Sequence, residues 1–226
     1  MPVGIVTGAS RGLGLALVRA LVEREWRLVV DARGAAALER AVADLGGIVG
    51  IAGDVADPEH RRALVESAGD RIDLLVNNAG ALGPSPQPRL AAYPLAELLR
   101  VYEVNVFAPL ALVQEALPRL VPDAAILHIT SDAAVEPYAG WGGYGSSKAA
   151  LEQMTAILAA EHPEWRVYRV DPGDMRTQMH QEAFPGEDIS DRPLPEVAVP
   201  GLVELLEGDR PSGRYQAQAL KEVVPV

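Results

Sequence analysis

Three side chains near the middle of the sequence could move a proton to or from an oxygen atom. Tyr144 and Lys148 are four residues apart and share one face of a helix, and Ser131 ends an apolar run that predicts a buried strand. A phenol has a pKa of about 10, which a neighbouring ammonium lowers by favouring the phenolate. We therefore expect Tyr144 to act as acid and base, with Lys148 lowering its pKa and Ser131 holding a substrate oxygen. Such a pair also occurs by chance on many helices, but Lys148 is one of only two lysines among 20 basic residues.

A glycine-rich turn near the N-terminus could hold a pyrophosphate. Residues 7–14 read TGASRGLG and lie between the first predicted strand and the first predicted helix. Gly8, Gly12 and Gly14 would let the backbone approach a phosphate closely, and the helix would offer free N–H groups at the positive end of its dipole. The alternative is a tight turn that only packs the helix against its strand.

The end of the second predicted strand carries residues that could distinguish the two nicotinamide dinucleotides. An acidic residue there binds the ribose 2′-hydroxyl of NAD, whereas arginine accepts the 2′-phosphate of NADP. Arg33 follows this strand, and we expect Arg11 of the glycine turn to converge with it on one phosphate group. Asp31 precedes Arg33, and a carboxylate pointing at the ribose would reverse the preference. We expect NADP(H), with NAD(H) as the alternative.

Apolar runs alternate with helical patterns along the chain. The runs are short and apolar at nearly every position, which is typical of parallel strands buried on both faces. The pattern predicts an α/β fold, a Rossmann-type doubly wound parallel sheet of about seven strands with helices on both faces, in a single dinucleotide-binding domain over residues 1–226. The six strands that we can place are Val3–Thr7, Arg27–Asp31, Gly47–Ala52, Ile72–Val76, Ala125–Thr130 and Arg166–Val170.

The segments between these strands are helical patterns and two irregular loops. We expect residues 94–120 to form two helices or one kinked helix. Loops 81–92 and 178–195 follow strand ends on the side where such sheets bind ligands, so we expect them to border a substrate site, with two ordinary surface loops as the alternative. The expected helices are Leu13–Glu25, Ala35–Leu45, Glu59–Ala68, Pro94–Leu120, Tyr144–Ala160 and Leu194–Leu206.

Composition excludes several classes of function. The 226 residues carry a net charge of −11, which argues against binding to nucleic acid or to an anionic membrane, because phosphate groups need a basic surface. The sequence has no cysteine and its four histidines lack metal-ligand spacing, so we expect no disulfide and no metal site. No apolar run has the length of a membrane span. We therefore expect a cytoplasmic protein.

Taken together, the motifs resemble those of the short-chain dehydrogenases/reductases. They occur in the family's order and approximate spacing from Val3 to about Tyr215. The resemblance implies NAD(P)-dependent interconversion of a carbonyl and an alcohol, a small-molecule substrate, and a homodimer or homotetramer built on the helices that carry Asn105 and Tyr144. The matching segments are TGASRGLG at 7–14, Asp54-Val55, NNAG at 77–80, Asn105, Ser131, YGSSK at 144–148 and Pro172-Gly173 through Thr177.

The resemblance also implies a role for each matching residue. Tyr144 corresponds to the catalytic acid and base, Ser131 to the residue that orients the carbonyl, and Lys148 to the lysine that lowers the tyrosine pKa and binds the nicotinamide ribose. Asn105 resembles the asparagine that holds a relay water at a kink between two helical segments. With the arginine argument included, the expected cofactor-binding residues are Gly8, Ser10, Arg11, Gly12, Leu13, Gly14, Arg33, Asp54, Val55, Asn77, Ala79, Gly80, Tyr144, Lys148, Pro172, Gly173, Met175 and Thr177.

The chain departs from the family pattern in several places. Asp171 stands before Pro-Gly, where the family usually has a small or apolar residue. The linker 118–123 is compressed, the segment after Thr177 is short, and residues 212–215 replace the usual glycine-rich end of the last strand. These departures bear on the substrate pocket and the subunit contacts, and they leave the catalytic set intact.

The residues between Ser131 and Tyr144 bear on the substrate. Tyr138 and Trp141 predict an apolar or planar substrate, although packing against a neighbouring loop would explain them too. The acidic loop 178–195 counts against acyl-carrier or coenzyme-A thioesters. The alternative to an enzyme is a catalytically silent sensor that binds NADP(H) on the same fold, and the presence of both Tyr144 and Lys148 argues against it. Epimerisation or dehydration would need a larger substrate lobe.

Overall fold

The computed structural model describes residues 1–220, so Lys221 lies outside it, and contains one seven-stranded sheet whose strands all run parallel. The strand order is β3-β2-β1-β4-β5-β6-β7, so the chain reverses direction across the sheet between β1 and β4. Ligands of such sheets bind at the carboxyl ends of the strands beside this reversal. The strands are β1 Val3–Val6, β2 Arg27–Ala32, β3 Ile48–Ala52, β4 Ile72–Asn77, β5 Leu120–Ile129, β6 Arg166–Asp171 and β7 Gly213–Gln216.

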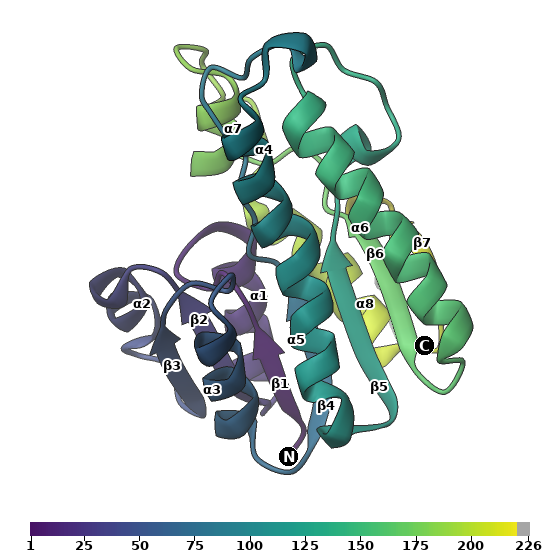
Figure 1. Cartoon of the computed structure of the whole chain (residues 1–226). Coiled ribbons are helices and arrows are strands. Elements are labelled where there is room, and N and C mark those ends of the chain that lie inside the picture. The colour runs from purple at the N-terminus through teal and green to yellow at the C-terminus, as the bar shows by residue number, and fades with distance from the viewer. Residues whose placement is uncertain (221–226) are drawn as a thin grey trace.

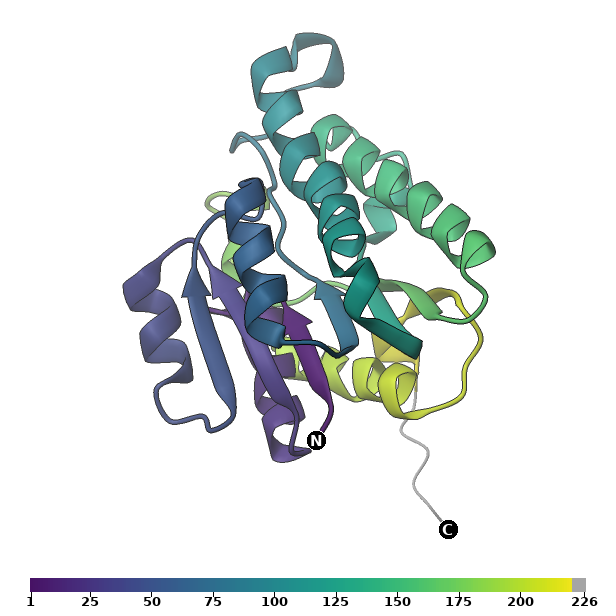
Figure 2. The same ribbon diagram turned by 60° about the horizontal axis from the view of Figure 1, so that its bottom comes forward.

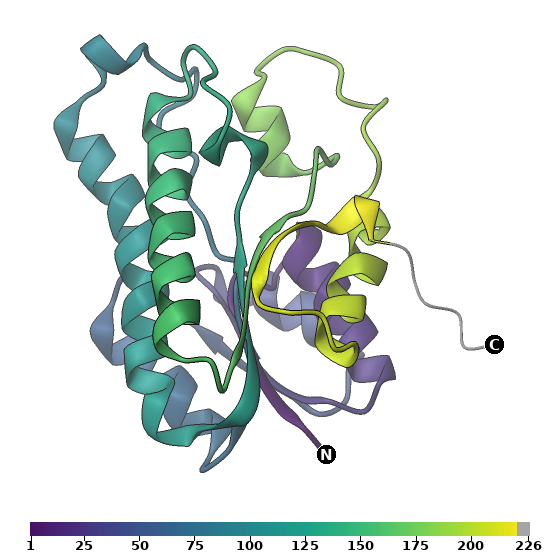
Figure 3. The same ribbon diagram turned by 90° about the vertical axis from the view of Figure 1, so that its right-hand side faces the viewer.

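Helices cover both faces of the sheet. One layer holds α1, α2 and α8, and the other holds α3, α5 and α6 (Figures 1 and 3). Figure 2 shows the sheet twisting between these layers, with the N-terminus at its amino edge. The fold class predicted from the sequence is confirmed. The helices are α1 Gly12–Glu23, α2 Ala35–Val42, α3 Pro58–Ala68, α4 Leu95–Tyr102, α5 Ala108–Ala116, α6 Gly142–Glu161, α7 Gln178–Ala183 and α8 Val199–Glu207.

The sheet is buried on both faces because alternate residues of each central strand enter different cores. Ile5 and Val29 pack with α3 and α5, whereas Val6 and Val30 pack with α1 and α8. All four side chains are fully buried. This double burial explains why the strands are apolar at successive positions rather than at every second one.

Residues 94–120 contain a kinked helical region, which is one of the two arrangements expected from the sequence. Helices α4 and α5 are joined by a π-helical turn at Glu103–Phe107. The wider turn lets the chain change direction without ending the helical hydrogen bonding, and such turns are frequent at functional sites. It places Asn105, which is fully buried, against the loop that follows β4.

Two local expectations were wrong. β5 begins at Leu120, inside the segment expected to be helix and linker, because Pro118 stops the helix and α5 ends at Ala116. The first six residues of the loop expected at 178–195 form α7, whose N-terminus is capped by the Thr177 hydroxyl accepting from the His180 N–H at 3.1 Å. The seventh strand, β7, lay outside the strands that we could place because it is a half-buried edge strand without an apolar run.

The glycine turn gives a stability prediction. A Cβ on Gly14 would lie 2.4 Å from the Gly8 carbonyl oxygen, whereas a Cβ on Gly46 meets nothing within 4 Å. We expect Gly14→Ala to lower the free energy of unfolding by about 1–3 kcal/mol, as overpacking does, and Gly46→Ala to change it by less than about 0.5 kcal/mol. Urea unfolding without added ligands measures both. Equal effects of the two substitutions would contradict the close approach.

Candidate active site

Ser131 and Tyr144 line one cavity of about 430 Å³ above the carboxyl ends of β5 and β6. The segment after β6 and α7 form its other wall and contribute Pro172, Gly173, Met175 and Thr177, which the sequence assigned to the cofactor. The structure therefore brings together residues from three separate motifs. A more open hollow of about 590 Å³, beside Arg166 at the amino edge of the sheet, contains none of the predicted site residues.

The Ser131 hydroxyl is held by the residues that follow it. Its Oγ donates to the Asp132 carboxylate at 2.8 Å and accepts from the Ala133 N–H at 3.1 Å. The second Asp132 oxygen accepts from the Tyr138 hydroxyl at 2.9 Å. Asp132 thus fixes the serine side chain at the cavity wall.

Tyr144 and Lys148 are both buried and lie close together on α6. The Lys148 Nζ is 5.6 Å from the centre of the Tyr144 ring and donates to the Ile129 carbonyl at 2.8 Å. Helix α6 can approach the turn that follows β5 this closely because residue 145 is glycine, where a Cβ would lie 2.7 Å from the Ala133 carbonyl oxygen. The helix therefore positions the pair from beneath the cavity.

The structure does not show the lowering of the Tyr144 pKa that the sequence predicts. Burial raises the pKa of the phenol well above its ordinary value, the carboxylates of Asp132 and Asp171 raise it further, and only Ser131 acts in the opposite direction. Burial also lowers the pKa of Lys148 to about 8. The prediction was wrong because desolvation outweighs a lysine whose amine is bonded to a backbone carbonyl instead of the phenol.

Asn105 clamps the loop that follows β4. Its Oδ1 accepts from the Ala81 N–H at 2.8 Å, and its Nδ2 donates to the Ala81 carbonyl at 2.9 Å and to the Ser147 hydroxyl at 2.9 Å. Gly80 lies beside this clamp, since a Cβ there would be 3.6 Å from the Asn105 Oδ1 and 3.8 Å from the Lys148 Nζ. The asparagine side chain therefore ties the β4 loop to α6.

The glycine turn fits an anionic ligand such as a pyrophosphate. The α1 N-terminus has no side-chain cap and no acidic residue in its first turn, so its N–H groups and dipole are free to meet a negative charge. Gly8 and Gly12 have positive φ angles of 72° and 59°, which glycine adopts without strain. Leu13 faces inward and packs in the core.

Two residues that sequence reasoning missed hold this turn to the next strand. The Asn78 side chain donates to the Thr7 carbonyl at 2.8 Å and to the Gly8 carbonyl at 3.1 Å. The Thr7 hydroxyl accepts from the Asn78 and Ala79 N–H groups at 3.0 Å each. Asn77, which we had chosen from the same motif, is instead buried in β4. The signal for Thr7 and Asn78 was available, since each is the polar residue next to its strand end.

The Asp31 carboxylate is buried and bonded to other groups of the protein. Its side chain is 2% exposed, one oxygen accepts from the Gly8 N–H at 2.7 Å, and the other lies 2.9 Å from the His60 Nε2. The carboxylate therefore stabilises the glycine turn and does not extend past the strand end. This removes the residue that would have favoured NAD in the sequence argument.

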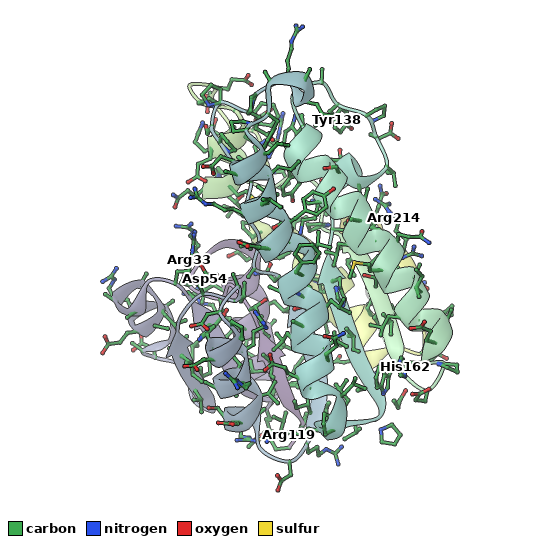
Figure 4. All side chains as sticks on the ribbon, viewed as in Figure 1. Arg33, Asp54, Arg119, Tyr138, His162 and Arg214 are labelled. Atoms are coloured by element: carbon green, nitrogen blue, oxygen red, sulfur yellow. The ribbon has the colours of Figure 1, made fainter. Side chains whose placement is uncertain are left out.

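Arg33 and Asp54 follow β2 and β3, and Figure 4 shows them close together, whereas Arg11 stands at the N-terminus of α1. The structure gives the Arg11 guanidinium a different partner from the one expected, because it donates to the Gln178 side chain at 2.6 Å. Arg33 is exposed. Asp54 folds back on the Ala56 N–H at 2.9 Å, and Val55 is buried beside it.

Two departures from the family pattern, Asp171 and the sequence of β7, are in contact with each other. Asp171 is buried, and its carboxylate lies 3.5 Å from the guanidinium of Arg214, a β7 residue. Arg214 also donates to Glu152 of α6 at 3.0 Å and to the Ser131 carbonyl at 3.2 Å. Arg214 is labelled beside α6 in Figure 4. The buried carboxylates thus have a basic partner that also holds the backbone of Ser131.

Residues 1–220 contain no group of three or more His, Cys, Asp or Glu side chains that could hold a metal ion. Over the same residues, no helix is both long and apolar enough to cross a membrane.

The sequence and the fold are both similar to those of known proteins. The sequence profile of the short chain dehydrogenases matches residues 2–188. The chain is 34% identical to the Saccharomyces cerevisiae benzil reductase that forms (S)-benzoin, over 79% of this chain and 73% of the relative. A solved chain from Pseudomonas syringae, assigned to the short chain dehydrogenases, has a TM-score of 0.87 at 30% identity, covering 96% of this chain and 94% of that one. A chain from Shigella flexneri with the same assignment, solved with NADP, has a TM-score of 0.86 at 26% identity, covering 96% and 97%.

The buried Lys148 gives a prediction about stability. Because its pKa in the folded chain is about 8, below the ordinary 10.5, the unfolded chain binds more protons between these values and the free energy of unfolding rises with pH there. At neutral pH the folded chain carries the full cost of the buried ammonium. We expect Lys148→Met to raise the free energy of unfolding at pH 7 by roughly 2–3 kcal/mol. This gain should shrink as the pH rises from about 8 to about 10.

Urea unfolding at several pH values measures this difference. The exposed Arg40 of α2 supplies the control, since Arg40→Met removes a positive charge without removing a buried one. A loss of stability in Lys148→Met that is the same at every pH would contradict the cost assigned to the ammonium.

Proposed function

This chain belongs to the short chain dehydrogenase family and is an oxidoreductase that acts on alcohols and carbonyls, and we propose that it uses NADP(H) with Tyr144 as acid and base. The observation that carries the proposal is the arrangement of Ser131 and Tyr144 at one cavity, with Lys148 and Asn105 directly behind them. The glycine turn and the uncapped α1 N-terminus supply the neighbouring anion site.

Each of these residues has a separate role in the reduction of a carbonyl. Tyr144 donates its phenolic proton to the carbonyl oxygen, and its raised pKa keeps that proton in place at neutral pH. Ser131 holds the same oxygen beside the phenol once its hydroxyl proton turns from the Asp132 carboxylate to that oxygen. Lys148 lies behind the ring, and Asn105 fixes the β4 loop that forms the wall of the cofactor site. The dinucleotide, when bound, supplies or accepts the hydride.

Preference for NADP(H) is supported by Asp31 and Arg33. The Asp31 carboxylate is buried between Gly8 and His60, so it offers no acceptor to a ribose hydroxyl. Arg33 is exposed at the end of β2, where a 2′-phosphate would lie. The Gln178 side chain that accepts from Arg11 is uncharged, so a dianionic phosphate would compete with it for the guanidinium.

We also propose a homodimer or homotetramer built on α4 and α6. Leu99 of α4, Phe107 of the π-helical turn and Ile157 of α6 are large apolar side chains exposed to solvent in the single chain. They lie on the helices that carry Asn105 and Tyr144. The cytoplasmic location expected from the sequence stays a prediction.

Removal of the phenolic oxygen tests the acid–base role. We expect Tyr144→Phe to lower kcat for NADPH-dependent reduction of aldehydes and ketones by at least about 100-fold. NADPH binding, followed by fluorescence, should be nearly unchanged because the ring is retained. Comparable turnover in the variant would contradict the proposed mechanism. Tight NADPH binding by the wild-type chain without turnover of a broad carbonyl panel would favour the sensor alternative.

Arg33 is the residue that tests cofactor choice. We expect Arg33→Gln to weaken NADPH binding about tenfold or more, since it removes a charge-assisted hydrogen bond, and to leave NADH binding unchanged. Arg40→Gln, which removes an exposed charge from α2, serves as the control. Titration of both dinucleotides into each variant measures the effect. A wild-type preference for NADH would overturn the assignment.

A further inference from the structure

The candidate substrate cavity is lined by three carboxylates and by no lysine or arginine among the described residues. The carboxylates belong to Asp132, Asp171 and Asp174. A cavity of about 430 Å³ with this lining carries a negative potential wherever its acids lack a basic partner. The three acids differ in that respect.

Asp132 is the carboxylate without a basic partner. Asp171 lies 3.5 Å from Arg214, and Asp174 lies 3.6 Å from Arg192 and 3.8 Å from His180. Within residues 1–220, Asp132 takes part in no ion pair. Its hydrogen bonds come from the hydroxyls of Ser131 and Tyr138 and from the Ala133 N–H, all neutral donors. A partly buried carboxylate at the wall of a cavity with only neutral donors lacks a compensating positive charge.

Aromatic side chains line the same cavity. The Trp141 ring packs edge-on against Tyr144, with centroids 5.8 Å apart, and also contacts Phe184 and Tyr138 at 5.8 and 6.4 Å. Tyr138 is labelled beside the start of α6 in the upper part of Figure 4. Aromatic faces attract cations as well as apolar groups. The cavity therefore combines an unpaired negative charge with rings that accept a positive group.

His180 adds an acceptor that has no partner. Its side chain is 11% exposed, it lines the same cavity, and its Nε2 is buried without a hydrogen bond among residues 1–220. The Nδ1 faces the Asp174 carboxylate at 3.8 Å. If Nδ1 carries the ring proton on that side, Nε2 presents a lone pair, which suits an N–H donor on a ligand.

We propose that the physiological substrates carry a protonated amino group a few bonds from the reacting carbon, and that Asp132 binds this ammonium. The inference rests on the proposed function and names the substrate class of the same site. The Asp132 Oδ1 is 2.8 Å from the Ser131 Oγ, so an oxygen held by Ser131 lies close to the carboxylate. An ammonium two or three bonds from the carbonyl carbon reaches Asp132 while the oxygen stays on Ser131 and Tyr144.

A bound ammonium also stabilises the charge that develops during the reaction. Negative charge develops on the carbonyl oxygen during reduction, and a carboxylate beside it opposes that change. A bound positive charge next to Asp132 offsets this opposition in the transition state, so the amino group should raise kcat as well as lower KM. Keto acids would meet the unpaired carboxylate with a like charge and should be poor substrates.

Three phenyl ketones of matched shape test the proposal. β-Dimethylaminopropiophenone is a cation at neutral pH, isocaprophenone replaces its protonated N(CH3)2 group by CH(CH3)2, and β-benzoylpropionate carries a carboxylate at the same position. The kcat/KM of each is measured with NADPH for the wild-type chain, for Asp132→Asn, and for Asp44→Asn. Asp44 is exposed and far along the sequence from the cavity residues, so it controls for the loss of one negative charge.

We expect the wild-type chain to prefer the cation over the neutral ketone by about tenfold or more, equivalent to about 1.4 kcal/mol, and to disfavour the anion. Asp132→Asn should remove most of this preference, and Asp44→Asn should retain it. The ratio between ketones cancels any general effect of Asp132 on Ser131. An unchanged ratio in Asp132→Asn, or a wild-type preference for the neutral or anionic ketone, overturns the proposal. If the wild-type chain reduces no carbonyl compound at all, the proposed function fails, and this inference fails with it.

Discussion

The burial of two ionisable side chains beneath one cavity is the constraint on which the rest of the site depends. Tyr144 and Lys148 sit together on α6, and removal of water raises the pKa of the phenol and lowers that of the amine. The two side chains are buried where α6 packs closely, through Gly145, against the turn that follows β5. The same contact brings Ser131, at the end of β5, beside the phenol.

The parallel sheet turns separate motifs into one site. Because all seven strands run in the same direction, the glycine turn after β1, the Asn78 loop after β4 and Ser131 after β5 meet at one edge. Asp31 and Asn105 then lock these loops from inside, the first through Gly8 and the second through Ala81. The segments that bind and the residues that react are therefore positioned by hydrogen bonds between buried side chains and the backbone, which leaves the exposed side chains free to meet ligands.

Local pattern predicted the doubly wound sheet and the Ser131, Tyr144 and Lys148 set, because buried strands and helix spacing leave direct signals in the sequence. It could not predict contacts between distant segments. The pairing of Asp171 with Arg214 joins residues 43 positions apart, and only the register of β6 and β7 brings them together. The sign of the Tyr144 pKa shift depends in the same way on burial and on Asp132, which spacing along a helix does not reveal.

The central claim is that Ser131 and Tyr144 share the oxygen atom of the substrate. A crystal structure of the chain with NADP⁺ and a bound alcohol or ketone tests it most directly. We expect the substrate oxygen to lie within hydrogen-bond distance of both the Ser131 Oγ and the Tyr144 hydroxyl, with the reacting carbon facing the nicotinamide. A substrate oxygen bound elsewhere in the cavity, with Tyr144 out of reach, would contradict it.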